Sequence, residues 1–200
     1  MLELSHMYIV GLGNPGAEYT ESRHNVGRAI LEKFRKKNNF SDWQDSKKMN
    51  GLISEGKIGK NHVTLMLPEL YMNKSGSSVK KLVTNKKKAQ SLIVVYDEID
   101  MGLGTMKIVF NRGSGGHKGI ESVVKSIGTP EFARLRVGIS PRTLSGKIKK
   151  PKGDKKIIDF VLGKFTKKEL EILKKIEKKA IEALETFIEE GRMVTMNRFN

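Results

Sequence analysis

Short apolar runs alternate with amphipathic segments along most of the chain. The runs are rich in Val, Ile, Leu and Tyr and are bounded by glycine or polar residues, which is typical of buried β-strands. The segments interpreted as strands are residues 8–11, 51–67 (a hairpin that turns at residues 59–61), 91–96, 106–110 and 135–139. Glycine and asparagine at the turn favour the hairpin interpretation.

The clearest helix follows Thr166, because Thr166 and Glu169 have the spacing of a capping box and Gly191 supplies a helix-ending residue. Its apolar stripe consists of Leu170, Leu173, Ile176, Ala180, Leu184 and Phe187. Helical spacing of apolar residues also predicts a helix from Val26 to a basic end at residues 35–37. Shorter helices are predicted over residues 77–83 and 117–127, and residues 86–88 are interpreted as a solvated basic run.

Strands that alternate with helices predict an α/β domain with a central, mixed β-sheet and helices on both faces. We expect residues 7–200 to form this single domain and residues 1–6 to be a vector leader. Residues 141–156 are punctuated by Pro and Gly and are rich in lysine, so they predict a mobile basic loop. Its lysines are Lys147, Lys149, Lys150, Lys152, Lys155 and Lys156.

Composition adds one unusual feature, a strong positive charge. The chain has 38 basic and 22 acidic residues among 200, which gives a net charge of +16, and its hydrophobic fraction of 38% is sufficient for a folded core. A domain this basic usually binds a polyanion. The alternative is that the lysines serve solubility or reflect the base composition of the genome.

The absence of cysteine excludes disulfides, a cysteine nucleophile, Fe–S clusters and Cys-ligated zinc. The four histidines lack paired ligand spacing, so neither a metal nor another cofactor is expected. No apolar run reaches the roughly 18 residues of a membrane span.

Two predicted strands lead into polar residues: the first leads to Asn14 and the strand over residues 91–96 leads to Asp97. If these strands are parallel neighbours, both residues lie in the crevice beyond the carboxyl ends of the strands. His24, at the start of the first helix, can reach the same edge, and His117 lies at the next glycine-rich entry to a helix. A histidine beside a carboxylate forms a general-base pair. Without cysteine or a Gly-x-Ser-x-Gly motif, water is the simplest nucleophile.

A carbonyl substrate would need donors for the developing oxyanion, and Asn14, Asn73 and backbone N–H groups near Gly115 and Gly116 are candidates. Ordinary structural roles remain open for each residue. His24 can be a surface histidine, Asp97 a turn cap, Asn14 a turn residue and Asn73 a helix cap.

The glycines at positions 11, 13 and 16 match a dinucleotide-binding fingerprint. Residues 34–40 are too polar for the second strand that this fingerprint requires, which argues against a nucleotide site.

Several ordered sequence blocks resemble the bacterial-type peptidyl-tRNA hydrolase family from Tyr8 to near the C-terminus. The blocks are IVGLGNPG (9–16) with Tyr19 and RHN (23–25); LP (67–68) and YMNKSG (71–76); DEID (97–100); GGHKG (115–119); Phe132 with RLRVG (134–138); and FVLG (160–163).

The resemblance implies hydrolysis of the ester between a peptide and the 3′ ribose of tRNA. It makes His24 the general base for water, supported by Asp97, and it implies that Asn14 distinguishes a blocked amino group from a free one. Asn73 would contact the substrate near the ester. Tyr19 and Tyr71 would line the substrate channel, where the family often has Phe in place of Tyr71, and His117 would contact the substrate.

Two positions depart from the family pattern. The common Gly-Gly-His-Asn-Gly block has Lys118 in place of Asn, and a charged lysine donates hydrogen bonds but accepts none. Arg136 matches an arginine that holds the tRNA 5′ phosphate, whereas its usual lysine partner falls at Val109. Lys107 is the nearby substitute, and a surface strand charge is the alternative for Arg136.

We therefore expect a cytoplasmic, monomeric enzyme whose partner is the acceptor stem and 3′ end of peptidyl-tRNA, without membrane association. Lysines of residues 147–156 and of the last helix are candidates for contacts with the acceptor–TΨC region. The last-helix lysines are Lys174, Lys175, Lys178 and Lys179. Two alternatives stay open: an RNA-binding protein of the same fold that has lost hydrolysis, and a nucleotide-binding module.

Overall fold

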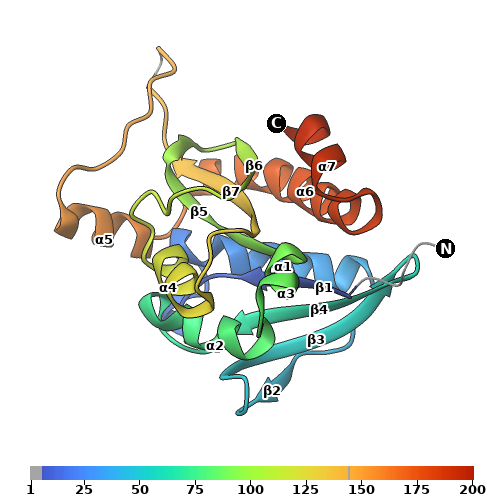
Figure 1. Cartoon of the computed structure of the whole chain (residues 1–200). Helices are drawn as coiled ribbons and strands as arrows, with labels where there is room; N and C mark the ends of the chain where they lie inside the picture. The colour runs from blue at the N-terminus through green and yellow to red at the C-terminus, as the bar shows by residue number, and fades with distance from the viewer. Residues whose placement is uncertain (1–5, 144) are drawn as a thin grey trace.

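The computed structural model describes residues 6–143 and 145–200, which form one seven-stranded mixed sheet with helices on both faces (Figure 1). The strand order is β2-β3-β4-β1-β5-β7-β6. The strands are β1 His6–Gly11, β2 Gln44–Ser46, β3 Gly51–Ile58, β4 Asn61–Pro68, β5 Leu92–Gly102, β6 Met106–Phe110 and β7 Ala133–Ser140. The four central strands β4, β1, β5 and β7 are parallel, and β2, β3 and β6 pair antiparallel to their neighbours.

The helices are divided between the two faces of the sheet. They are α1 Val26–Lys37, α2 Ser75–Leu82, α3 Lys86–Gln90, α4 Lys118–Ile127, α5 Asp154–Leu162, α6 Lys167–Glu190 and α7 Arg192–Phe199. Three short 3₁₀ turns are η1 Ala17–Tyr19, η2 Arg23–Asn25 and η3 Met72–Lys74. Helices α1 and α6 bury their apolar stripes in one core, and α2 and α4 bury theirs in the other.

Strand alternation explains how one sheet serves two cores. Ile9 of β1 packs in the core under α1 and α6, whereas its neighbours Tyr8 and Val10 pack in the core under α2 and α4. Both faces of the central parallel strands are therefore covered, which is the usual arrangement for parallel sheets.

The predicted α/β class, the five strand segments, the hairpin and the capping box of α6 are confirmed. Lys86 and Lys87 are exposed and Lys88 is half-buried, in agreement with a solvated basic run, and the run lies in α3, which is capped by Asn85 and buries Ala89. The prediction of a loop over residues 141–156 is wrong at its end, because α5 begins at Asp154.

The segment interpreted as a vector leader lies mostly outside the described residues, since the structure describes the chain from His6. His6 itself belongs to β1 and pairs with His62 of β4. Among the described residues, no helix combines the length and apolar character needed to cross a bilayer.

Candidate active site

The site lies beside the carboxyl end of β1, where the neighbouring parallel strand β5 continues past it. Gly11, the last residue of β1, pairs with Val95 of β5. The chain then continues from β1 to Asn14, while β5 continues past its β1 partner to Asp97. The expectation that Asn14 and Asp97 come from neighbouring parallel strands is confirmed, but Asp97 lies within β5 and not beyond its end, because the strand continues to Gly102 beside β7. Asp97 is almost completely buried, with 2% of its side chain exposed.

Asp97 accepts hydrogen bonds from two imidazoles. Nδ1 of His24 lies 2.8 Å and 2.9 Å from the two carboxylate oxygens, and Nε2 of His117 lies 3.0 Å from Oδ1. The two rings are 5.0 Å apart between centroids. The structure thus brings together three of the residues predicted from sequence, and it adds a contact between His117 and Asp97 that the sequence did not indicate.

The hydrogen bonds fix the proton positions on both rings. Nδ1 of His117 caps α4 by accepting the N–H of Ile120 at 3.2 Å, so its proton is on Nε2, facing Asp97. Nδ1 of His24 faces the carboxylate and carries a proton, which leaves Nε2 of His24 as the free basic nitrogen.

The electrostatics of the pair favour an ionised carboxylate. Burial alone would raise the pKa of Asp97, but His24 and His117 hold it well below its usual range. Burial alone would lower the pKa of His24, yet the charge and hydrogen bond of Asp97 outweigh this effect, so the pKa is raised. Nε2 of His24 is therefore a stronger base than the same atom of an ordinary histidine.

The same groups do not suit a metal ion, although His24, Asp97 and His117 present ligand atoms within 4.8 Å of one another. Nδ1 of His117 faces an N–H donor and must stay unprotonated, so a neutral His117 keeps its proton on Nε2. That nitrogen has no lone pair to offer a cation beside Asp97. The arrangement fits a hydrogen-bonded triad.

A second network joins the segments around this triad. Asn25 and Asn14 bond reciprocally: the backbone N–H of Asn14 donates to Oδ1 of Asn25 at 2.8 Å, and Nδ2 of Asn25 donates to the Asn14 carbonyl at 2.9 Å. The backbone N–H of Met72 donates to Oδ1 of Asn14 at 2.8 Å. Because Met72 can only donate there, the Asn14 amide is oriented with its NH₂ group as the remaining donor. Asn25 was not among the predicted site residues, although it directly follows His24 and belongs to the RHN block that carries the family resemblance.

The turn η3, fixed by Asn14, carries two further predicted residues. Asn73 is exposed, and Tyr71 is 58% exposed and contacts Tyr19 edge to face, with ring centroids 6.4 Å apart. These aromatic rings form an exposed apolar surface beside the loop that contains Asn14. Of the backbone donors predicted near Gly115 and Gly116, the N–H of Gly116 is used by Oγ of Ser114 at 3.2 Å.

Lys118 and Arg136 each form an ion pair. Lys118 is exposed and pairs with Glu121 one turn along α4 at 3.2 Å. Arg136 binds one oxygen of the buried Glu98 through Nε at 3.0 Å and Nη2 at 2.9 Å. Lys107 is opposite Arg136 in the pairing of β6 with β7.

Lys107 and Arg136 share one pocket with a third cation, Arg112. It is lined by Tyr96, Glu98, Lys107, Val109, Arg112, Gly113, Gly115 and Arg136. Burial, with the nearby Glu98 charge, raises the pKa of Tyr96 to about 12, so this phenol is neutral at ordinary pH. Glu98 was not predicted as a site residue, although it directly follows Asp97.

Comparisons with known proteins identify the family. The family model described as peptidyl-tRNA hydrolase matches residues 8–200. The peptidyl-tRNA hydrolase of Clostridium novyi is 37% identical over 193 residues, covering 96% of both chains, and that of Alkaliphilus oremlandii is 37% identical over 194 residues, covering 96% of this chain and 98% of the relative.

A solved structure gives the same result. The crystal structure of peptidyl-tRNA hydrolase from Acinetobacter baumannii superimposes with a TM-score of 0.87 at 31% identity, and the match covers 99% of this chain and 96% of that one. A match of this extent in sequence and in fold shows that the chain belongs to the peptidyl-tRNA hydrolase family.

Proposed function

We propose that this chain hydrolyses the ester bond between the peptide and the tRNA of peptidyl-tRNA, with His24 activating water and without a covalent intermediate. The observation that carries the proposal is the hydrogen bond from Nδ1 of His24 to the buried Asp97, which leaves Nε2 of His24 free and basic. Family membership supports the substrate class.

In the first step, Nε2 of His24 takes a proton from water as the water oxygen attacks the ester carbonyl. The imidazole becomes positively charged, and the ionised Asp97 stabilises that charge through Nδ1. The carbonyl oxygen becomes an oxyanion. The oriented NH₂ group of Asn14 and the exposed amide of Asn73 are its proposed donors.

In the second step, the tetrahedral intermediate collapses and the bond to the ribose 3′ oxygen breaks. His24 returns its proton from Nε2 to that oxygen, which gives tRNA with a free 3′ hydroxyl and a peptide with a free carboxyl group, which then loses its proton to solvent. His24 ends in its starting state. The protein forms no bond to the peptide, so nothing but water is consumed.

The remaining predicted residues would hold the substrate. Asn14 would discriminate a blocked amino group from a free one. Tyr19, Tyr71, His117 and Lys118 would contact the peptidyl end. The pocket that contains Arg136 and Lys107 would hold a phosphate of the acceptor stem, because its cations outnumber the single carboxylate of Glu98. We also propose that the protein acts as a monomer, and a substrate released by translation supports a cytoplasmic location.

One experiment tests this function directly. Purified protein should release peptide from N-acetyl-aminoacyl-tRNA and leave free aminoacyl-tRNA largely intact. His24→Ala should lower kcat by roughly 10²- to 10⁴-fold with little change in tRNA affinity. Near-normal turnover in His24→Ala, or a peptide trapped covalently on the protein, would contradict the mechanism.

An RNA-binding protein of the same fold that has lost hydrolysis is the second candidate. Intact His24, Asp97, Asn14 and Asn73 favour the enzyme over this candidate. Tight binding of N-acetyl-aminoacyl-tRNA without any cleavage would favour the binding protein instead.

A further inference from the structure

Two of the sequence blocks, at residues 23–25 and 160–163, lie against each other next to the triad. The backbone N–H of Arg23 donates to the carbonyl of Gly163 at 3.0 Å, and Ser22 forms an antiparallel bridge with Lys164. Arg23 is 8% exposed and directly precedes His24. The connection between α5 and α6 therefore packs against the turn η2, which presents His24 to Asp97.

The guanidinium of Arg23 is held on several sides. Nη1 donates to the carbonyl of Lys164 at 2.6 Å, and Nη2 donates to Oε2 of Glu169 at 2.9 Å. The group also lies 4.6 Å from the ring centroid of Phe160 and 5.0 Å from that of Phe165. A planar cation with a fixed fork of donors satisfies all these contacts, whereas the single ammonium of lysine does not.

The carboxylate that binds Arg23 is itself fixed by the start of α6. Glu169 accepts the N–H of Thr166 at 2.7 Å, and Thr166 accepts the N–H of Glu169 at 3.3 Å, which completes the capping box. Burial alone would raise the pKa of Glu169, but the bonds to Thr166 and the charge of Arg23 lower it. Arg23 thus binds an ionised group whose position is set by the first turn of a long helix.

The residue on the other side of His24 is also anchored, because Asn25 bonds reciprocally with the backbone of Asn14. We propose that Arg23 is a positioning residue, which sets the distance and orientation of His24 relative to Asp97 by fixing η2 to the α5–α6 connection. This inference rests on the proposed function, in which His24 is the general base. Arg23 itself touches no reacting atom.

The variant Arg23→Lys tests the proposal because it keeps the charge and removes the fork and the stacking. Arg35→Lys is the matched control. Arg35 is similarly buried, 9% exposed, and it also binds carboxylates (Glu32 and Asp42), a backbone carbonyl and an aromatic ring, but at the far end of α1. We expect both variants to lose thermal stability. Only Arg23→Lys should lower kcat, by about 10- to 100-fold with KM little changed, because small misplacements of a catalytic group are costly.

A second readout needs no turnover. The titratable groups that contact the His24 ring are Asp97 of β5 and His117, the cap of α4. If η2 shifts, the contact with Asp97 weakens. The pKa of His24 measured by NMR should then fall in Arg23→Lys and stay at the wild-type value in Arg35→Lys.

A wild-type kcat together with an unchanged His24 titration in Arg23→Lys would overturn the proposal and leave Arg23 a purely stabilising residue. If Arg23→Lys does not fold, Phe165→Leu removes one stacking ring while keeping apolar bulk, and it should change kcat and the His24 pKa in the same direction to a smaller extent. A wild-type protein that fails to cleave N-acetyl-aminoacyl-tRNA would contradict the proposed function, whereas the NMR titration would still test the anchoring.

Discussion

Asp97 is buried between two imidazoles, and its charge affects the protonation of His24. Asp97→Asn keeps the size of the side chain and removes the charge. The base must be neutral to act, so kcat/KM should rise with pH through the pKa of His24. Because Asp97 raises that pKa, the rise should move to lower pH in Asp97→Asn.

The plateau of the same pH profile should fall by roughly 10²- to 10⁴-fold in Asp97→Asn, since the imidazolium loses its counter-charge and its fixed tautomer. Steady-state rates with N-acetyl-aminoacyl-tRNA between pH 5 and 9, at the ionic strength used for wild type, measure both effects. If the rise stays at the wild-type pH, the charge of Asp97 does not affect the pKa of His24.

Lys118 stands beside His117 where the family commonly has asparagine, and its exposed ammonium pairs with Glu121. As a donor to a peptide carbonyl or a phosphate it should contribute about 0.5–1.5 kcal/mol. Lys118→Ala should therefore raise KM roughly 2- to 10-fold and leave hydrolysis otherwise intact. Lys125→Ala, an exposed lysine further along α4, is the control. If Lys118→Ala changes neither kcat nor KM, this residue has no part in substrate binding.

At the scale of elements, the turn η2, which contains His24, directly precedes α1. The distance of α1 from the sheet therefore affects the position of His24. Gly27 permits a very close approach: a Cβ there would lie 2.3 Å from the carbonyl oxygen of Val95 and 2.7 Å from that of Leu12. Both are backbone atoms of the sheet edge and cannot move aside. Gly27→Ala should therefore push α1 away from β5 and destabilise the fold by about 1–3 kcal/mol.

Urea unfolding measures this loss, with Gly119→Ala as the control. Gly119 is also a buried helical glycine, but its added Cβ would first meet the flexible Met72 side chain, which can shift. We expect the smaller loss there. If the two variants lose equal free energy of unfolding, glycine at position 27 is not needed for the close approach of α1 to the backbone of the sheet.

Elements with strong local patterns were predictable, and elements defined by distant contacts were not. The α6 helix has a capping box, a long apolar stripe and a terminal glycine. By contrast, α5 and α7 each bury one residue, Val161 and Thr195, and therefore show no stripe. The edge strand β2 consists of three polar residues.

The same distinction holds in the site. His24 and Asp97 could be found because His24 precedes a helix with a clear apolar face and Asp97 directly follows the apolar run at residues 92–96, which lies beside the first strand. The second histidine on Asp97 and the anchoring of Arg23 depend on contacts 20 and 146 residues apart in the sequence, which local patterns do not show.

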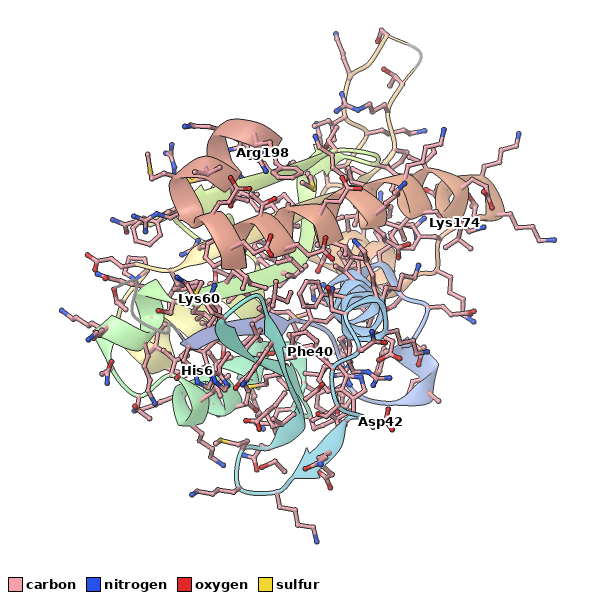
Figure 2. All side chains as sticks on the ribbon, turned by 90° about the vertical axis from the view of Figure 1, so that its right-hand side faces the viewer. His6, Phe40, Asp42, Lys60, Lys174 and Arg198 are labelled. Carbon is pink, nitrogen blue, oxygen red and sulfur yellow. The ribbon has the colours of Figure 1, made fainter. Side chains whose placement is uncertain are left out.

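At the scale of the whole molecule, the basic residues that give the net charge of +16 lie on several surfaces, some near the site and others far from it. The basic segment between β7 and α5 projects from the body of the protein (Figure 1), and Lys150 within it is tied by an ion pair to Asp100 of β5. Lys174 projects from α6, and Lys60 lies at the turn between β3 and β4 (Figure 2). The segment before α5 thus starts beside the strand that carries Asp97, whereas the β3–β4 turn lies at the other end of the molecule.

This difference predicts which lysines bind tRNA. Each lysine that contacts a phosphate releases counterions, so affinity should fall steeply with salt. Replacing Lys147, Lys149 and Lys152 by Gln should weaken tRNA binding and reduce the slope of log K against log salt by about 1 for each phosphate that is no longer bound. A matched triple replacement at Lys57, Lys60 and Lys86, all exposed and at the end of the parallel strands opposite to the site, removes the same charge and should change the slope little.

Binding titrations with deacylated tRNA at several salt concentrations distinguish direct phosphate binding from the effect of net charge. Since these lysines lie outside the triad, kcat at saturating substrate should be unchanged in both triple variants. If the two variants lower the slope equally, the basic segment acts only through total charge and binds no phosphate of its own. A slope near zero for the wild-type protein would mean that no counterions are released on association. The positive surface would then play no part in tRNA binding.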